Sequence, residues 1–201
     1  MQKIIKQYIL DFLNNWEKEN SPEIYNETAF QFELGLYLRD KLKNSEFKVH
    51  FERDIVSMYN LNGLYKRNPD ILIFKDGCKD KYAIELKYPM PSDGAPDKMF
   101  EMLTDIAFVY QLKNNGFTGT YAITLTNRED FYVKREERKA EYTGAPKRGT
   151  VFRENYPNIE IKVPSKYFQT KKGTGREVIV PSFTGKWEKL SNGFRYYIIE
   201  P

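Results

Sequence analysis

Two carboxylates and one ammonium group stand on either side of a short charged turn, at Asp70, Glu85 and Lys87. Asp70 opens the apolar run 71–74, and the other two lie within the run 82–88. Both runs are rich in β-branched and aromatic residues and are bounded by turn residues, a pattern typical of strands. Two acids and a lysine can hold a cation and polarise a water molecule, provided that the fold brings them together.

The turn between the two runs is short, charged and contains Asp-Gly, which predicts a β-hairpin. A hairpin that is symmetric about the middle of this turn places Asp70 opposite Glu85. Residues two apart on a strand share a face, so Glu85 and Lys87 point the same way, and Ile84 and Leu86 point into the core. We therefore predict that the three charged groups converge on the exposed face of a small sheet.

Such a cluster favours metal-dependent chemistry. Two carboxylates within reach of each other repel, so a proton or a cation must lie between them. Oxygen ligands with open positions filled by water suit Mg²⁺ or Mn²⁺. The ammonium of Lys87 can orient an attacking water or stabilise charge on a phosphate under attack. The alternative, an edge hairpin with a solvated ion pair, explains the bare motif about as well.

The residues Pro69-Asp70 followed by Glu85-Leu86-Lys87 resemble the signature of the PD-(D/E)XK nuclease superfamily, which has the restriction-endonuclease-like fold. The resemblance implies that Asp70 and Glu85 ligate Mg²⁺ (or Mn²⁺) with help from the Leu86 carbonyl. It also implies that Lys87 positions or deprotonates the attacking water.

Length predicts a single domain over 1–201. The resemblance implies a nuclease-like core at 22–127, and the remaining segment, 128–201, is expected to be a β-rich basic extension. Hydrophobic residues make up 40% of the chain and aromatic residues 15%, which argues against disorder. The single cysteine excludes an internal disulfide and a cysteine-based zinc site. No signal peptide or membrane-spanning run is visible, so we expect a soluble, cytoplasmic protein.

Two helices are predicted before the first strand. Apolar residues at helical spacing indicate an amphipathic helix over 3–18. Residues 21–23, Ser-Pro-Glu, have the cap, proline and acid of a helix start, and this second helix is expected to reach about Lys43.

Glu27 lies on the same stripe of the second helix as Leu34 and Leu38. The resembled superfamily often aims a glutamate of its first core helix at the active site, which implies that Glu27 holds a second metal ion or a water bound to it. Glu33 is a rival but lies well round the helix from the stripe. An ordinary early-helix glutamate, favoured by the helix dipole, is an equally good interpretation of Glu27.

A first strand is expected over 47–56, and a polar loop over 58–68 leads to the acidic motif. Tyr65, Lys66 and Arg67 in this loop could hold a phosphate backbone or stack on a base. A plain connecting loop explains these residues nearly as well.

A long helix is predicted from Asp97 to about residue 115, followed by a strand over 118–126. Asp97, Glu101 and Asp105 form a row of acids at a spacing of four, which we interpret as a solvated helix face rather than as part of the site. The order helix, three strands, helix and strand matches the αβββαβ core of the resembled superfamily. It predicts a mixed sheet flanked by helices.

The net charge is +4, and basic residues outnumber acids most clearly over 134–176. Aromatic residues are interleaved with them, so this segment is a candidate clamp for nucleic acid. A solvated basic surface is the alternative. The basic residues singled out for nucleic-acid binding are Lys147, Arg148, Lys171 and Lys172.

The sequence thus predicts an α/β (α+β) protein with the restriction-endonuclease-like core, an added N-terminal helix and a β-rich C-terminal extension. The function that the resemblance implies is a Mg²⁺-dependent endodeoxyribonuclease of the restriction, defence or repair type. Two alternatives stay open: a catalytically inactive nucleic-acid-binding module and an RNA-cleaving nuclease. The expected partner is nucleic acid, with DNA first, and no membrane; a homodimer is expected only by analogy with double-strand cutters.

Overall fold

The structure is a computed structural model that describes residues 1–16, 22–77, 79–132, 160–163, 167–171 and 176–201. Side chains are described for all of these except 160–163, 167–171 and 176. The elements are, in chain order, α1 (Gln2–Asn15), α2 (Glu27–Leu42), β1 (Lys48–Phe51), α3 (Ile55–Tyr59), β2 (Ile71–Phe74), β3 (Lys81–Lys87), α4 (Ala95–Asn114), β4 (Gly119–Thr126), the 3-10 turn η1 (Glu129–Phe131), β5 (Glu160–Val163), β6 (Tyr167–Lys171), β7 (Arg176–Val180), β8 (Phe183–Lys186), β9 (Glu188–Lys189) and β10 (Arg195–Ile199).

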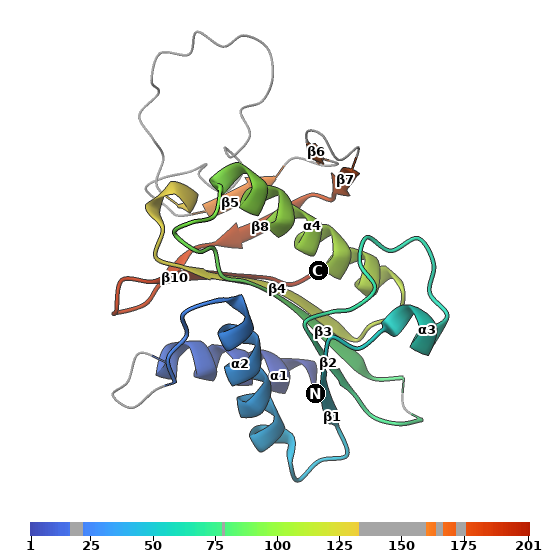
Figure 1. The fold of residues 1–201 in the computed structure, drawn as a ribbon. Coiled ribbons are helices and arrows are strands. Elements are labelled where there is room, and N and C mark those ends of the chain that lie inside the picture. Colours follow the sequence, from blue (N-terminus) through green and yellow to red (C-terminus); the bar gives the residue numbers. More distant parts are fainter. Residues whose placement is uncertain (17–21, 78, 133–159, 164–166, 172–175) are drawn as a thin grey trace, which may run out of the picture.

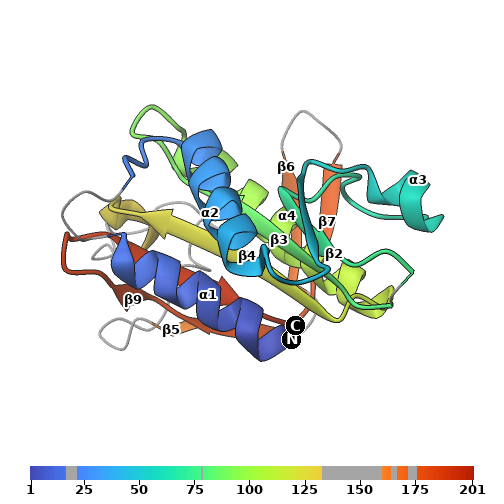
Figure 2. The same ribbon diagram turned by 90° about the horizontal axis from the view of Figure 1, so that it is seen from below.

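A mixed sheet of six strands, in the order β1-β2-β3-β4-β10-β9, forms the centre of the molecule. Strands β3 and β4 are parallel and are joined through α4, and every other neighbouring pair is antiparallel. Helices α1 and α2 cover one face, and α4 covers the other (Figure 1). The view from below shows α1 and α2 side by side across the sheet (Figure 2). The predicted mixed sheet flanked by helices is confirmed.

Strands β2 and β3 form the predicted hairpin with the predicted register. Ile71 pairs with Ile84, so the next position along the ladder brings Asp70 opposite Glu85. The turn includes Gly77 at a φ of +68°, a conformation that glycine adopts without steric cost. The hairpin therefore sets the spacing of the two acids, as the sequence predicts.

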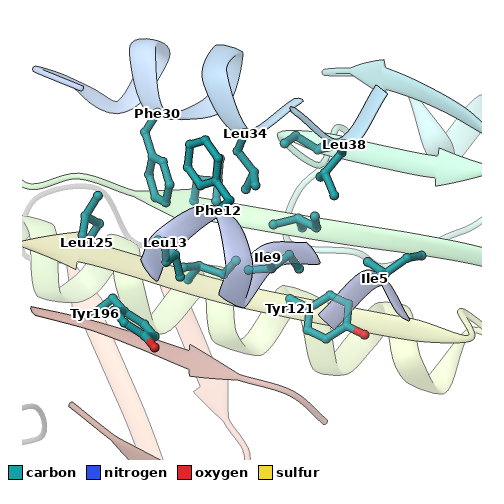
Figure 3. Close-up of a cluster of buried hydrophobic side chains, with 14 of the residues drawn as sticks. Ile5, Ile9, Phe12, Leu13, Phe30, Leu34, Leu38, Tyr121, Leu125 and Tyr196 are labelled. Atoms are coloured by element: carbon teal, nitrogen blue, oxygen red, sulfur yellow. The ribbon is translucent and has the colours of Figure 1, made fainter. Parts of the chain in front are cut away.

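The face of the sheet under α1 and α2 is filled by apolar side chains (Figure 3). Each helix supplies residues at the spacing of one helical face, and alternate residues of β4 and β10 meet them. The labelled members of this cluster are Ile5, Ile9, Phe12, Leu13, Phe30, Leu34, Leu38, Tyr121, Leu125 and Tyr196.

Several element bounds differ from the prediction, and in two cases the reason is a side-chain cap that lies further along the chain. Helix α2 begins at Glu27 instead of near residue 22, since the Asn26 side chain accepts a hydrogen bond from the Ala29 N–H at 2.7 Å. The strand expected over 47–56 ends at Phe51, because Asp54 caps α3 by accepting from two backbone N–H groups of its first turn. Helix α4 begins two residues before Asp97.

The segment after residue 127 contributes to the central sheet, which the sequence did not predict. Strand β10 pairs with β4, and the predicted Asn192-Gly193 turn joins it to β9, with Gly193 at a φ of +88°. Val178 and Val180 of β7 pack with side chains of α4. In the part of the chain that the structure describes, no helix has the length and apolar character needed to cross a membrane.

Candidate active site

The predicted site residues meet at the end of β3, where the start of α2, the residue before β2 and the middle of α4 approach one another. The Nζ atom of Lys87 donates to Glu27 Oε1 at 3.0 Å, and the Tyr88 N–H donates to Glu27 Oε2 at 3.4 Å. Glu27 can reach β3 because it opens α2, at the end of the stripe that carries Leu34 and Leu38. The structure thus places Glu27 beside Lys87.

Asp70 is held against β3 by a backbone contact. Its Oδ2 accepts a hydrogen bond from the Leu86 N–H at 2.6 Å, and its carbonyl accepts from Gln31 Nε2 at 2.8 Å. Loss of contact with solvent raises the pKa of Asp70 to about 6, although the positive charge of Lys66 opposes this rise. The group that Leu86 directs to Asp70 is its N–H; a role for its carbonyl as a metal ligand stays a prediction.

Glu85 is fully buried, which corrects the expectation of an exposed charged face. Strand β3 lies in the middle of the sheet, and α4 covers one of its faces (Figure 1). Lys87 pairs with Asp105 of α4, and Glu85 shares its side of β3 because the alternate residues Ile84 and Leu86 face α1 and α2. Burial raises the pKa of Glu85 well above its usual range, and the negative charge of Asp70 adds to this, while Lys66 opposes it. Glu85 Oε2 pairs with Lys66, and Oε1 has no hydrogen-bond partner.

Asp105 of α4 belongs to the site, although the sequence analysis predicted that its side chain faces solvent. It is 5% exposed, and its Oδ1 accepts from Lys66 Nζ at 3.0 Å. Its Oδ2 lies 3.4 Å from Lys87 Nζ and makes no hydrogen bond. The expectation of a solvated acidic row was therefore wrong for Asp105, whereas the Glu101 side chain, 3.9 Å from Lys87, remains 37% exposed.

Lys66 is, after Asp105, the second charged residue that the sequence analysis did not place in this cluster. Its ammonium lies between Glu85 and Asp105. Burial alone would lower the pKa of Lys66, but the two carboxylates more than offset it, so the pKa is raised. The loop that carries Lys66 is fastened to α4, since Gln111 accepts from the Tyr65 N–H at 2.8 Å and donates to the Gly63 carbonyl at 3.1 Å.

Of the residues predicted to contact nucleic acid, the structure describes those in the loop before β2 but not the side chains of those in the basic extension. In the loop before β2, the Tyr65 hydroxyl accepts from the Ile179 N–H at 3.0 Å, and Arg67 pairs with Asp54 at 2.6 Å. For these residues and for Lys66, contact with nucleic acid stays a prediction. The same holds for the basic extension: Lys147, Arg148 and Lys172 lie outside the described residues, and Lys171 lies in β6 without a described side chain.

The donor set fits a divalent cation, although Lys66 now lies within it. Over the described ranges, no three Asp, Glu, His or Cys side chains form a ready-made metal site. Glu85 Oε1 and Asp105 Oδ2 are nevertheless buried acceptors without a hydrogen bond. Buried carboxylate oxygens left in this way are costly, and a bound cation would satisfy them. All the available ligands are oxygens, as Mg²⁺ and Mn²⁺ prefer.

Comparisons with known proteins identify no relative of this chain. No family model matches it, and neither the search of curated proteins nor that of solved structures found a match. The chemistry of the site is therefore inferred from its own geometry and charges.

Proposed function

We propose that the protein is a metal-dependent phosphodiesterase that cleaves nucleic acid, with DNA as the first expected substrate and a site of the PD-(D/E)XK type. The main support is a cluster of charged groups at the end of a central strand: Glu85 and Asp105 both pair with Lys66, and Asp105 also lies 3.4 Å from the buried Lys87. Asp70 is held beside them by the Leu86 N–H. Two of the carboxylate oxygens there are buried without a hydrogen bond. Such a cluster does not stabilise an apolar core, because burying charge lowers stability, and this favours a functional role for it.

Mg²⁺ or Mn²⁺ would be held by Asp70, Glu85 and Asp105, with the Leu86 carbonyl as a further ligand. The bound ion would supply positive charge that stabilises the phosphate in the transition state and the leaving oxygen. The chain itself holds the acids in place through the β2–β3 register and the Leu86 N–H.

Lys87 acts as a cation that positions the attacking water. Burial tends to lower its pKa, but Asp105 and Glu27 more than compensate, so the pKa of Lys87 is raised above its usual value. A lysine of this kind donates hydrogen bonds and does not accept a proton, which favours positioning over general-base catalysis. The water oxygen bonds to phosphorus in line as the bond to the 3′ oxygen breaks, and the product keeps a 5′ phosphate. The attacking water gives up its proton to bulk solvent, and the departing 3′ oxygen takes up a proton from solvent.

One observation favours a second candidate function, a catalytically inactive nucleic-acid-binding module. The Lys66 ammonium already neutralises part of the charge of Glu85 and Asp105. If Lys66 were a permanent counter-ion, the cluster would hold no metal ion, and the protein would bind nucleic acid without cutting it.

Cleavage assays separate these functions. The purified protein is incubated with supercoiled plasmid, single-stranded DNA and RNA in the presence of Mg²⁺, Mn²⁺ or EDTA. We expect cutting that requires the divalent ion and falls by ~10²–10³-fold in Lys87→Met, because a transition-state charge contact is lost. The matched control is Lys113→Met, at the far end of α4, where the ammonium donates to the Thr118 carbonyl at 2.9 Å.

The outcomes distinguish the proposals clearly. Cutting of RNA but not DNA would change the substrate class and keep the site. Binding of nucleic acid without cutting in any ion would support the inactive module. Cutting that persists in Lys87→Met would show that another group, or a contaminating nuclease, does the chemistry.

A further inference from the structure

The Lys66 ammonium occupies the position in which a bound cation would satisfy both Glu85 and Asp105. It pairs with Glu85 Oε2 and with Asp105 Oδ1, the latter at 3.0 Å. The other oxygen of each carboxylate is buried and makes no hydrogen bond. Lys66 therefore pairs with only two of the four carboxylate oxygens of Glu85 and Asp105.

The charge balance around this position is incomplete. Glu27, Asp70, Glu85 and Asp105 bring four carboxyl groups, and Lys66 and Lys87 bring two ammonium groups. With Lys66 in place and all four carboxyl groups ionised, the negative charges exceed the positive ones by two. If a divalent cation takes the place of Lys66, the excess falls to one, and buried charge is most stable when it is balanced.

Lys66 can leave without a change of fold. Its side chain is 29% exposed, whereas those of Glu85 and Asp105 are 0% and 8% exposed, so the ammonium stands at the mouth of the cluster. The backbone on either side is fastened, by Gln111 to the Tyr65 N–H and by the Ile55 N–H to the Arg67 carbonyl at 3.1 Å. Rotation of the lysine side chain alone would move the charge into solvent, a fast motion.

We propose that the Lys66 ammonium and a divalent cation are alternative occupants of the Glu85–Asp105 pair, so that metal binding expels Lys66 toward solvent. In the metal-free protein Lys66 neutralises part of the buried carboxylate charge, and it weakens apparent metal affinity by competition. The released ammonium stands beside the site, where a substrate phosphate would attract it. The inference rests on the proposed metal site and adds the residue that regulates its occupancy.

The first test is calorimetric titration of Mn²⁺ into metal-free protein. Lys66→Met removes the competitor, and we expect Mn²⁺ to bind at least about tenfold more tightly. Lys98→Met is the matched control for the general loss of one positive charge, because Lys98 pairs with Glu101 at 2.9 Å and not with the Glu85–Asp105 pair. It should change the affinity by no more than about twofold. Equal affinities of wild type and Lys66→Met would overturn the proposal.

The second test uses the wild-type chain, so that it does not depend on the folding of a variant. Lys66 is acylated with a succinimidyl ester in EDTA or in Mn²⁺, and its labelling rate is read by peptide mass spectrometry with Lys98 as internal reference. Expulsion predicts labelling several-fold faster in Mn²⁺, since an ammonium held by two carboxylates is protected. An unchanged or slower rate would overturn the proposal.

The two proposals fail in different ways. Metal-dependent cleavage together with equal Mn²⁺ affinities would reject the competition and leave the nuclease standing. Tight Mn²⁺ binding by Lys66→Met, with no cleavage by any variant, would support the competition and reject the nuclease. No Mn²⁺ binding by any variant would reject both.

Discussion

The two faces of the central sheet are built from the same strands but have opposite character. Under α1 and α2 lie Ile84 and Leu86 of β3, in an apolar cluster. Under α4 lie Glu85 and Lys87 of the same strand, facing Asp105. Among the described residues these last three are the only charged ones that are buried, and ion pairs link Glu85 and Lys87 to Asp105 of α4, directly for Lys87 and through Lys66 for Glu85.

This difference indicates a division of labour within one sheet. The α1–α2 face contributes hydrophobic burial, worth roughly 25 cal/mol for each Å² of apolar surface removed from water. The α4 face carries charge that is unfavourable to bury and is retained where it serves chemistry. Substitutions on the first face should therefore change stability alone, and substitutions on the second should exchange stability for function. The following predictions rank these changes by their effect on the free energy of unfolding.

Ile84→Ala should give the largest loss of stability. The side chain is fully buried between the sheet and the two helices, so its truncation leaves a cavity and should lower the free energy of unfolding by about 3 kcal/mol. Urea denaturation measures this loss. Under conditions where the variant is folded, its Mn²⁺ affinity should stay within about twofold of wild type, because a cavity on this face removes no ligand.

Ile179→Ala is the matched control for that change. Ile179 is 55% exposed, and the same truncation there should alter the free energy of unfolding by less than ~0.5 kcal/mol. If Ile84→Ala weakened metal binding strongly while still folded, the two faces would be coupled and the division of labour would be wrong.

Asp70→Asn should stabilise the metal-free protein. The folded protein raises the pKa of Asp70 from 3.8 to about 6, so the carboxylate is less favourable in the folded than in the unfolded chain. At pH 7 in EDTA the substitution should raise the free energy of unfolding by on the order of 2 kcal/mol. The asparagine carbonyl can still accept from the Leu86 N–H. Denaturation in EDTA measures the gain, and calorimetry should show that Mn²⁺ binding is lost.

The sign of the pH dependence gives a further check on Asp70. Because the pKa is raised on folding, the folded state binds the proton more tightly, and wild type gains stability as the pH falls through 6. The advantage of Asp70→Asn should therefore be complete above pH 6 and disappear below the ordinary aspartate pKa of 3.8. An advantage that persists at low pH would have a cause other than charge. Asp76→Asn, in the exposed hairpin turn beside Lys48, is the control and should give no such gain.

The hairpin could be predicted from sequence because its determinants are local. The turn residues and the alternation of the two runs fix which positions face each other, so Asp70 and Glu85 follow directly. Glu27 was a candidate for a similar reason, since it shares a helical stripe with two leucines that are buried. What could not be predicted is which side of that hairpin would be covered, because this depends on α4.

Sequence patterns could not predict that Asp105 and Lys66 join the buried charge cluster, and the reasons are physical. Helix α4 is buried on most of its circumference, between the sheet and β7, so apolar spacing does not tell which acid faces inward. Lys66 lies in a loop without periodicity, and its direction is set by contacts with Gln111, 46 positions away from Tyr65. The pairing of β10 with β4 is likewise a long-range contact that no local signal encodes.

Glu27→Gln should have the smallest effect on stability and a clear effect on function. The Glu27 side chain is 36% exposed, so loss of its ion pair with Lys87 should change the free energy of unfolding by less than ~1 kcal/mol. Cleavage should fall by about tenfold, because the carboxylate no longer fixes the ammonium that positions the water. Glu33→Gln is the control on the same helix, since Glu33 lines a surface groove with Trp16 and Tyr37. Equal cleavage by the two variants would show that Lys87 is positioned without Glu27, and that α2 contributes no functional side chain to the site at the end of β3.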